Sequence, residues 1–294
     1  MTETNNSPLV KIVLLSATGF FMFVCMDSLA KFLGTVMPVT QGVWGRFFFH
    51  FVALVIYFLI FKPKVNLTKN FKIQILRSVL MVTATFFMFN SLQRFDLVDI
   101  YVVFFSAPLI VAILSAYFLK DVLSVKGFLL MLLSFGSIVY SLGPSMKVLS
   151  PELIFPLVPP LCWALYQFFT KLISGNNDPF AAVFYTAIIG TIVSSVYISF
   201  NWVPLEKNIY WIPLIIMGIA GFVSHFILIY AIQLSNLSFV TNFQYSQLLW
   251  STIINFLIFG VPADISKIIG LIGIIIFGVL FIRVEGSKKL KKIN

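Results

Sequence analysis

The chain has 294 residues, of which 60% are hydrophobic and only 10% are charged, and its mean hydropathy is +1.03. Globular domains are about 45–50% apolar and about 25% charged, so these proportions exclude an ordinary soluble protein. The net charge of +10 is distributed between apolar runs and at the C-terminus, which indicates membrane orientation rather than binding of nucleic acid.

Ten apolar segments follow one another along the chain, and a helix needs about 20 such residues to cross a bilayer. They cover 9–33, 39–61, 73–92, 98–119, 125–143, 152–173, 180–200, 210–233, 238–260 and 266–284. Prolines such as Pro38, Pro63 and Pro144 separate them, because proline disfavours a continuous helix. No segment alternates polar and apolar residues, which excludes a β-barrel. The sequence therefore predicts an all-α membrane protein with ten transmembrane helices.

The distribution of lysine and arginine predicts the orientation. An even number of spans places both termini on one side. With the termini inside, the inner segments and the C-terminal tail hold 13 basic residues and the outer segments hold 5. Basic residues are enriched in cytoplasmic loops, so we expect an inner-membrane protein with both termini and a basic tail in the cytoplasm.

The two halves of the chain are weakly similar. Lys31 and Lys171 lie 140 positions apart, and so do Ser106 and Ser246. This spacing predicts a duplication with repeats at 1–145 and 146–294. Because five spans per half is an odd number, the second repeat would be inverted relative to the first, an arrangement found in secondary transporters.

The charges inside the first span are candidates for function, because a charge within a bilayer is costly. Asp27 and Lys31 are four residues apart and therefore project from the same face of a helix. One interpretation is a self-neutralising pair. The other is a gating or coupling pair, in which Asp27 carries a proton.

Other cations are also candidates. Arg46, flanked by aromatic residues, is predicted to face a cavity and to bind a carboxylate or phosphate through two parallel hydrogen bonds. Arg77 lies near a basic loop and is expected to extend toward the membrane surface. Lys171 either marks the inner end of the sixth span or takes part in the site.

The ninth span is the most polar of the ten. Its polar and aromatic residues are either interhelical contacts, worth about 0.6 kcal/mol each, or one wall of a substrate site. The candidates in this span are Asn242, Gln244, Tyr245, Gln247 and Trp250. Residues predicted to line the same cavity from the fourth, sixth and seventh spans are Tyr101, Ser106, Trp163, Tyr166 and Tyr185.

The remaining polar residues point to no cofactor. His50 and His225 have no acidic neighbour at helical spacing and are interpreted as hydrogen-bonded core residues. No Walker loop, metal-binding cluster or serine triad is present in the sequence. Several glycines are expected where helices approach each other closely. They are Gly218, Gly221, Gly270, Gly273 and Gly278.

Four segments, at 27–31, 46–48, 105–121 and 243–250, together resemble helices of the EamA-type drug/metabolite transporters. This resemblance covers nearly the whole chain. It implies ten helices in two inverted five-helix halves that move small organic solutes without ATP. Similar members carry S-adenosylmethionine, although they tend to have an acid where Gln247 stands.

The sequence thus predicts a secondary active transporter for a small polar metabolite of anionic or zwitterionic character, such as an amino acid or a nucleoside-like compound. Its expected partners are this solute and membrane lipid, without nucleic acid, and the sequence leaves monomer and homodimer open. Two alternatives are a passive channel and a membrane enzyme acting on lipid. The enzyme would need a close acidic pair, for which Asp96 and Asp99 are the candidates.

Overall fold

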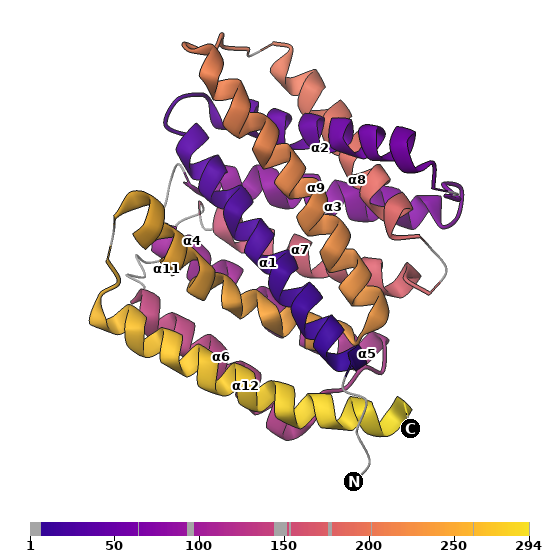
Figure 1. Ribbon diagram of the computed structural model, residues 1–294, viewed down its shortest axis with the longest axis vertical. Helices are drawn as coiled ribbons and strands as arrows, with labels where there is room; N and C mark the ends of the chain where they lie inside the picture. Colours follow the sequence, from indigo (N-terminus) through magenta and orange to yellow (C-terminus); the bar gives the residue numbers. More distant parts are fainter. Residues whose placement is uncertain are drawn as a thin grey trace.

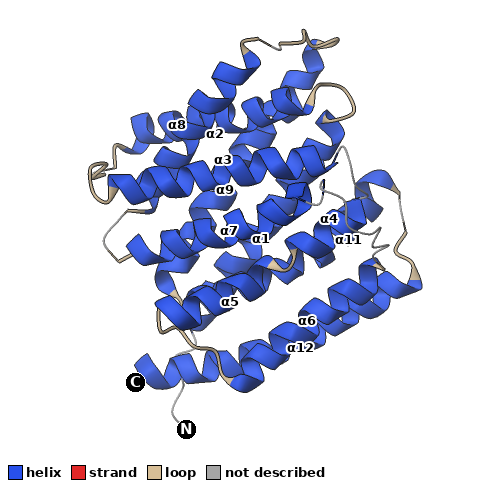
Figure 2. Ribbon diagram, turned by 180° about the vertical axis from the view of Figure 1, so that it is seen from behind, coloured by secondary structure: helices blue, strands red, loops and turns tan. Residues whose placement is uncertain are grey.

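The computed structural model describes residues 7–63, 65–92, 97–143, 152, 154–175, 178–200, 202–260 and 262–293. Within these ranges the chain forms helices and no strand (Figure 2). The predicted repeat boundary at 145 and 146 lies outside the described residues, as do Arg94 and Lys147 of the outer loops.

The described helices follow the predicted spans. In the first half they are α1 (Ser7–Leu33), α2 (Val39–Phe61), α3 (Phe71–Leu92), α4 (Leu97–Phe104), α5 (Ala107–Phe118) and α6 (Val125–Leu142). In the second half they are α7 (Ile154–Ile173), α8 (Pro179–Ile198), η2 (Asn208–Tyr210), α9 (Trp211–Leu234), α10 (Leu237–Thr241), η3 (Asn242–Tyr245), α11 (Ser246–Phe259) and α12 (Ile265–Ile293). Among the described residues, 8 segments are long and apolar enough to cross a membrane. The prediction of a multi-pass helical membrane protein is therefore confirmed.

The fourth and ninth predicted spans are interrupted. The fourth divides into α4 and α5 at Phe105 and Ser106, where Pro108 cannot donate a backbone hydrogen bond. The ninth divides into α10, the 3-10 turn η3 and α11. At both breaks a serine hydroxyl donates to the carbonyl three residues earlier, Ser106 to Val103 at 2.6 Å and Ser246 to Phe243 at 2.7 Å. Each predicted span therefore contains a break in its helix, although Ile100–Phe118 still forms one candidate membrane span.

The last helix is longer than predicted. Whereas the tenth span was expected to end at residue 284, α12 continues to Ile293, so the basic C-terminal segment forms further helical turns rather than a tail. Near this end the Glu285 carboxylate accepts hydrogen bonds from the Ser124 backbone N–H at 3.0 Å and from the Ser124 hydroxyl. This contact holds α12 against the N-terminus of α6.

The helices pack in pairs that join the two halves. The main pairs are α1 with α9, α3 with α7, α2 with α8 and α9, α3 with α8, and α6 with α12. Figure 1 shows α1 running beside α9 near the centre and α6 beside α12 at one edge, and Figure 2 shows the same arrangement from behind. The first turn of α1 and the last turns of α12 lie at one end of the bundle, where Leu9 approaches Gly286.

Three of the five glycines expected at helix crossings have that role. A methyl group at Gly218 would lie 2.8 Å from the His50 backbone nitrogen of α2. One at Gly270 would lie 2.8 Å from the Ser137 carbonyl oxygen of α6, and one at Gly273 would overlap the Ser137 hydroxyl. The expectation was wrong for Gly221, where contacts would be ordinary, and for Gly278, which has open space.

Candidate functional site

A cavity of about 710 Å³ lies between α1, α2, α3, α4 and α11. It reaches the loops at the end of the bundle away from the first turn of α1, since loop residues Gly34, Thr35 and Pro38 belong to its lining. Other residues that line it include Val24, Asp27, Lys31, Arg46, Thr85, Met88, Phe89, Tyr101, Phe104, Phe105, Gln247, Ser251, Pro262 and Lys267. Five of the predicted site residues are therefore brought together here. They are Asp27, Lys31, Arg46, Tyr101 and Gln247.

The cavity contains one acid and two cations from the first two helices. Asp27 and Lys31 lie one turn apart on α1, as their spacing predicted, and both line the cavity. Arg46 lines it from α2, although its side chain is only 6% exposed. Asp27 and Arg46 interact electrostatically. The arrangement offers a carboxylate for a cationic group and a guanidinium for an anionic group.

The Arg46 guanidinium is held from two other helices. One terminal nitrogen, Nη1, donates to the Thr85 hydroxyl of α3 at 3.1 Å, and Nη2 lies 3.3 Å from Nε2 of His225 on α9. Its Nε has no hydrogen-bond partner among the described residues. Thr85 was missed by the sequence analysis, yet one signal was present, because Thr85 and His225 are 140 positions apart. Arg46 therefore bridges two positions that are separated by the offset of the predicted duplication.

The rest of the cavity wall is mainly apolar and aromatic. Phe104, Phe105 and Tyr101 contribute from α4 and the residue after it, and Phe89 contributes from α3. Tyr101 and Phe105 stack with ring centroids 6.1 Å apart. Gln247 of α11 adds an amide to the cavity lining. Such a wall suits a ligand with a flat or apolar part and a few polar groups.

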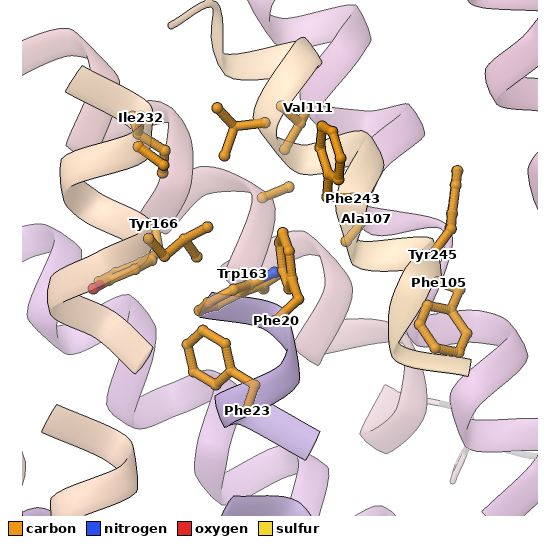
Figure 3. Close-up of a cluster of buried hydrophobic side chains, with 14 of the residues drawn as sticks. Phe20, Phe23, Phe105, Ala107, Val111, Trp163, Tyr166, Ile232, Phe243 and Tyr245 are labelled. Carbon is orange, nitrogen blue, oxygen red and sulfur yellow. The ribbon is translucent and has the colours of Figure 1, made fainter. Parts of the chain in front are cut away.

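Four predicted residues lie behind this wall rather than in it. Trp163 packs against Phe104 at 6.5 Å, and its indole N–H donates to the Gln244 side-chain oxygen at 3.1 Å. Tyr245 packs against Phe105 at 6.5 Å, and Tyr166 stacks on Trp163 at 5.4 Å. Figure 3 shows Phe23 beside Trp163 and Phe105 beside Tyr245 in this buried cluster. These side chains are packed in a buried cluster behind the cavity wall.

The structure does not bring the other five predicted residues to the cavity. Ser106 supports the break between α4 and α5. Asn242 is buried in η3, and Trp250 packs edge-on against Phe21 of α1. Lys171 donates to the carbonyls of Ile232 and Ser235, at 2.9 and 2.5 Å, and so caps the C-terminus of α9. The fifth, Tyr185, faces a loop.

The Tyr185 hydroxyl donates to the Leu67 carbonyl at 2.7 Å in the loop before α3. We expect Tyr185→Phe to leave the affinity of the cavity for its ligand unchanged and to lower the stability of the fold by about 1 kcal/mol, the usual net value of one hydrogen bond. Ligand titration and thermal unfolding of the purified variant test both statements. A weakened affinity with unchanged unfolding would instead place Tyr185 at the site.

Two expectations about buried residues need correction. Arg77 does not extend to the surface, because α7 and α8 cover it completely. His225 is a hydrogen-bonded core residue as interpreted, since its Nδ1 lies 3.1 Å from the Tyr166 hydroxyl. His50, in contrast, has no hydrogen-bond partner for either ring nitrogen among the described residues, and its ring stacks on His225 at 5.8 Å.

Asp264, which follows the cavity-lining residue Ala263, has a local structural role. Asp264 Oδ1 accepts a hydrogen bond from the Lys267 backbone N–H at 2.8 Å, and Oδ2 pairs with Lys267 Nζ at 3.2 Å. The backbone hydrogen bond is the main cause of the lowered pKa of this carboxyl group, so Asp264 caps α12 as an anion.

Comparisons with known proteins agree over nearly the whole chain. The sequence model of the EamA-like transporter family matches twice, at residues 10–143 and 150–284. An S-adenosylmethionine uptake transporter of Rickettsia bellii (strain RML369-C) is 24% identical over 274 residues, covering 90% of this chain and 91% of that protein. One from Rickettsia conorii (strain ATCC VR-613 / Malish 7) is 24% identical over 283 residues, covering 95% and 96%. A solved crystal structure superposes with a TM-score of 0.78 at 13% identity, covering 92% of this chain and 96% of the other, and has the same fold.

Proposed function

Since the chain belongs to the EamA-like transporter family, we propose that it is a secondary active transporter whose cargo is a small metabolite bearing an amino-acid group, with S-adenosylmethionine, which carries an additional sulfonium cation, as the first candidate. The family and its relatives are transporters, so the lipid-enzyme alternative is excluded. Its candidate acid Asp96 and the side chain of Asp99 lie outside the described residues. The observation that carries the proposal is the cavity in which Asp27, Lys31 and Arg46 meet an aromatic wall.

The chemistry of this cavity fits an amino-acid group joined to a flat ring. Asp27 is placed to bind the ammonium group, and Arg46 to bind the carboxylate through a charge-assisted pair of hydrogen bonds. Tyr101 and Phe105 offer ring faces for a base or another flat group. The volume of about 710 Å³ lies within the range of about 300–1,000 Å³ that is usual for small-molecule sites. Gln247 is an amide and not an acid, so it adds no charge to the cavity wall.

Alternating access between two inverted repeats is supported by three observations. The family model matches each half once. The serines at the two helix breaks, Ser106 and Ser246, make the same backbone contact 140 positions apart. The packing of the helices supports the same symmetry. If the ten spans are numbered in chain order and each is replaced by the span five positions later, counting on from the first span after the tenth, one observed helix pair becomes another observed pair. The pair α1 and α9 then becomes α7 and α3, and α2 with α9 becomes α8 with α3.

The proposed orientation in the inner membrane places both termini in the cytoplasm, following the excess of basic residues on that side. The cavity reaches the opposite end of the bundle, so the described conformation faces outward. At the closed end, the Asp121 carboxylate after α5 accepts a hydrogen bond from the Leu237 N–H at the start of α10, at 2.8 Å. This contact joins the two halves where a path to the cytoplasm would have to open.

Uptake by purified protein in liposomes tests the function. We expect saturable uptake of radiolabelled S-adenosylmethionine that accelerates when the liposomes contain unlabelled compound, because a carrier returns faster when loaded. A passive channel would show no such stimulation. If the protein shows no uptake, and if methionine, other amino acids and adenosine do not compete, a cargo bearing an amino-acid group is rejected.

Replacement of Asp27 distinguishes the two interpretations of the Asp27 and Lys31 pair, proton coupling and charge neutralisation. If it carries the coupling proton, Asp27→Asn will abolish accumulation against a gradient and spare exchange of internal for external substrate. The ratio of internal to external label in energised liposomes measures the first quantity, and counterflow measures the second. Unchanged accumulation would assign Asp27 to charge neutralisation of Lys31.

A further inference from the structure

Arg77 is a second buried guanidinium, located between the central cluster and the closed end of the bundle. Its side chain is 0% exposed. Nε donates to the Thr170 hydroxyl at 3.0 Å, and Nη1 donates to the Gln74 side-chain oxygen at 2.9 Å and to the Ala182 carbonyl at 2.6 Å. Nη2 has no partner among the described residues. All of these acceptors are uncharged.

No described acid makes an ion pair with Arg77, since Lys267 and Asp264 form the ion pair that the described residues contain. The nearest compensation is the Tyr166 ring, whose centroid lies 4.5 Å from the guanidinium carbon. A buried charge without a counter-charge is costly. The position therefore holds an unneutralised cation with one free donor.

Arg77 lies beside the residue that corresponds to Arg46 in the other half. Thr186 is 140 positions after Arg46. Its hydroxyl donates to the Ala182 carbonyl at 3.1 Å, and this is the same oxygen that accepts from Arg77 Nη1. The second half thus has threonine where the first has arginine, and Arg77 of α3 places a guanidinium at that point.

Gln167 occupies the position in the second half that corresponds to Asp27 in the first. It lies 140 positions after Asp27 and is 0% exposed. Neither its side-chain oxygen nor its nitrogen has a hydrogen-bond partner among the described residues. A fully buried amide that lacks both partners costs a few kcal/mol in a closed protein, and this cost is relieved if the amide meets ligand or water in another conformation.

A continuous chain of side-chain contacts joins the two guanidinium groups. Arg46 contacts His225 at 3.3 Å, His225 contacts the Tyr166 hydroxyl at 3.1 Å, and Arg77 lies over the Tyr166 ring. Tyr166 and His225 therefore lie between Arg46, which lines the open cavity, and Arg77, which is fully buried.

We propose that Arg77 is the anion-binding group of a second site, which opens toward the chain termini and receives the carboxylate of the cargo from Arg46. Gln167 and Thr186 flank this inner site. The proposal rests on the alternating access proposed above. It assigns an anionic ligand group to Arg77, whereas a purely structural Arg77 would only fasten α3 to α7 and α8.

Charge-selective thiol labelling tests this proposal without knowledge of the cargo. In a chain whose native Cys25 and Cys162 are replaced by alanine, Thr186→Cys places a thiol at the inner site. We expect an anionic methanethiosulfonate applied from the side of the termini to react at least about tenfold faster than a cationic one, because a basic cleft concentrates anions. Arg77→Gln should abolish this preference, and Arg77→Lys should keep it.

Thr85→Cys in the same background is the matched control. It should react from the opposite side of the membrane, and Arg77→Gln should not change its charge preference. A thiol at 186 that stays unreactive from the side of the termini, with and without S-adenosylmethionine, would overturn the inner site. So would a preference that does not depend on residue 77.

Uptake of labelled S-adenosylmethionine, measured in the same vesicles, distinguishes the two proposals. Selective labelling without uptake would reject this cargo and leave the inner site in place. Uptake without labelling at residue 186 would reject the inner site and retain the transporter.

Discussion

Arg46→Gln is expected to weaken binding of a carboxylate-bearing ligand in the cavity by about 30-fold or more. Loss of one partner from a buried, hydrogen-bonded charge pair costs about 2–5 kcal/mol, and about 1.4 kcal/mol corresponds to a factor of ten in affinity. The glutamine keeps a donor near Thr85 but removes the charge. Titration of the detergent-purified protein with labelled S-adenosylmethionine measures the effect.

Two control variants distinguish the loss of the Arg46 charge from a general disturbance of the fold. Arg46→Lys keeps the charge and loses the planar pair of donors, so we expect it to recover part of the affinity. Thr85→Val removes the hydroxyl that receives Arg46 Nη1 and should cause a smaller loss. An affinity that is the same in Arg46→Gln and the parent protein would remove Arg46 from the binding site.

Gly218→Ala is expected to cause a large loss of stability. The new methyl group would overlap the Phe49 side chain at its first carbon and lie 2.8 Å from the His50 backbone nitrogen. These atoms cannot move without separating α2 from α9. Overpacking of this kind costs about 1–3 kcal/mol, and thermal unfolding in detergent would show a lower midpoint.

Gly278→Ala is the matched control, because Gly278 also lies within a helix but its added methyl meets nothing within 4 Å. Alanine is favoured over glycine inside a helix by up to about 1 kcal/mol, so this variant should unfold at the same temperature or a higher one. Equal effects of the two substitutions would show that α2 and α9 separate at little cost.

Hydropathy and proline positions predicted the spans well, because a long apolar segment in a membrane can satisfy its backbone hydrogen bonds by forming a helix and in few other ways. The two breaks were missed for different reasons. Pro108 is a visible signal for the first one. The second, at 242–245, contains no proline, and all four residues of its 3-10 turn are buried.

The site was predicted in part by the cost of charge in a bilayer, which pointed to Asp27, Lys31 and Arg46. The polar residues of the ninth span were harder to place, because η3 changes the face that each later residue presents. Gln247 lines the cavity, whereas Gln244 bonds to Trp163 behind the wall. The burial of Arg77 could not be predicted either, because it depends on α7 and α8, which follow about a hundred residues later in the chain.

The length of α12 has a practical consequence for observing conformational change. Its 29 residues span about 44 Å at about 1.5 Å per residue, which exceeds the hydrocarbon thickness of about 30 Å. The helix therefore continues from the loop at the cavity rim to the other side of the membrane. A fluorescent reporter fused to Ile293 without a flexible linker would report on the orientation of α12, so its anisotropy and its distance to a second label would follow the motion of this helix.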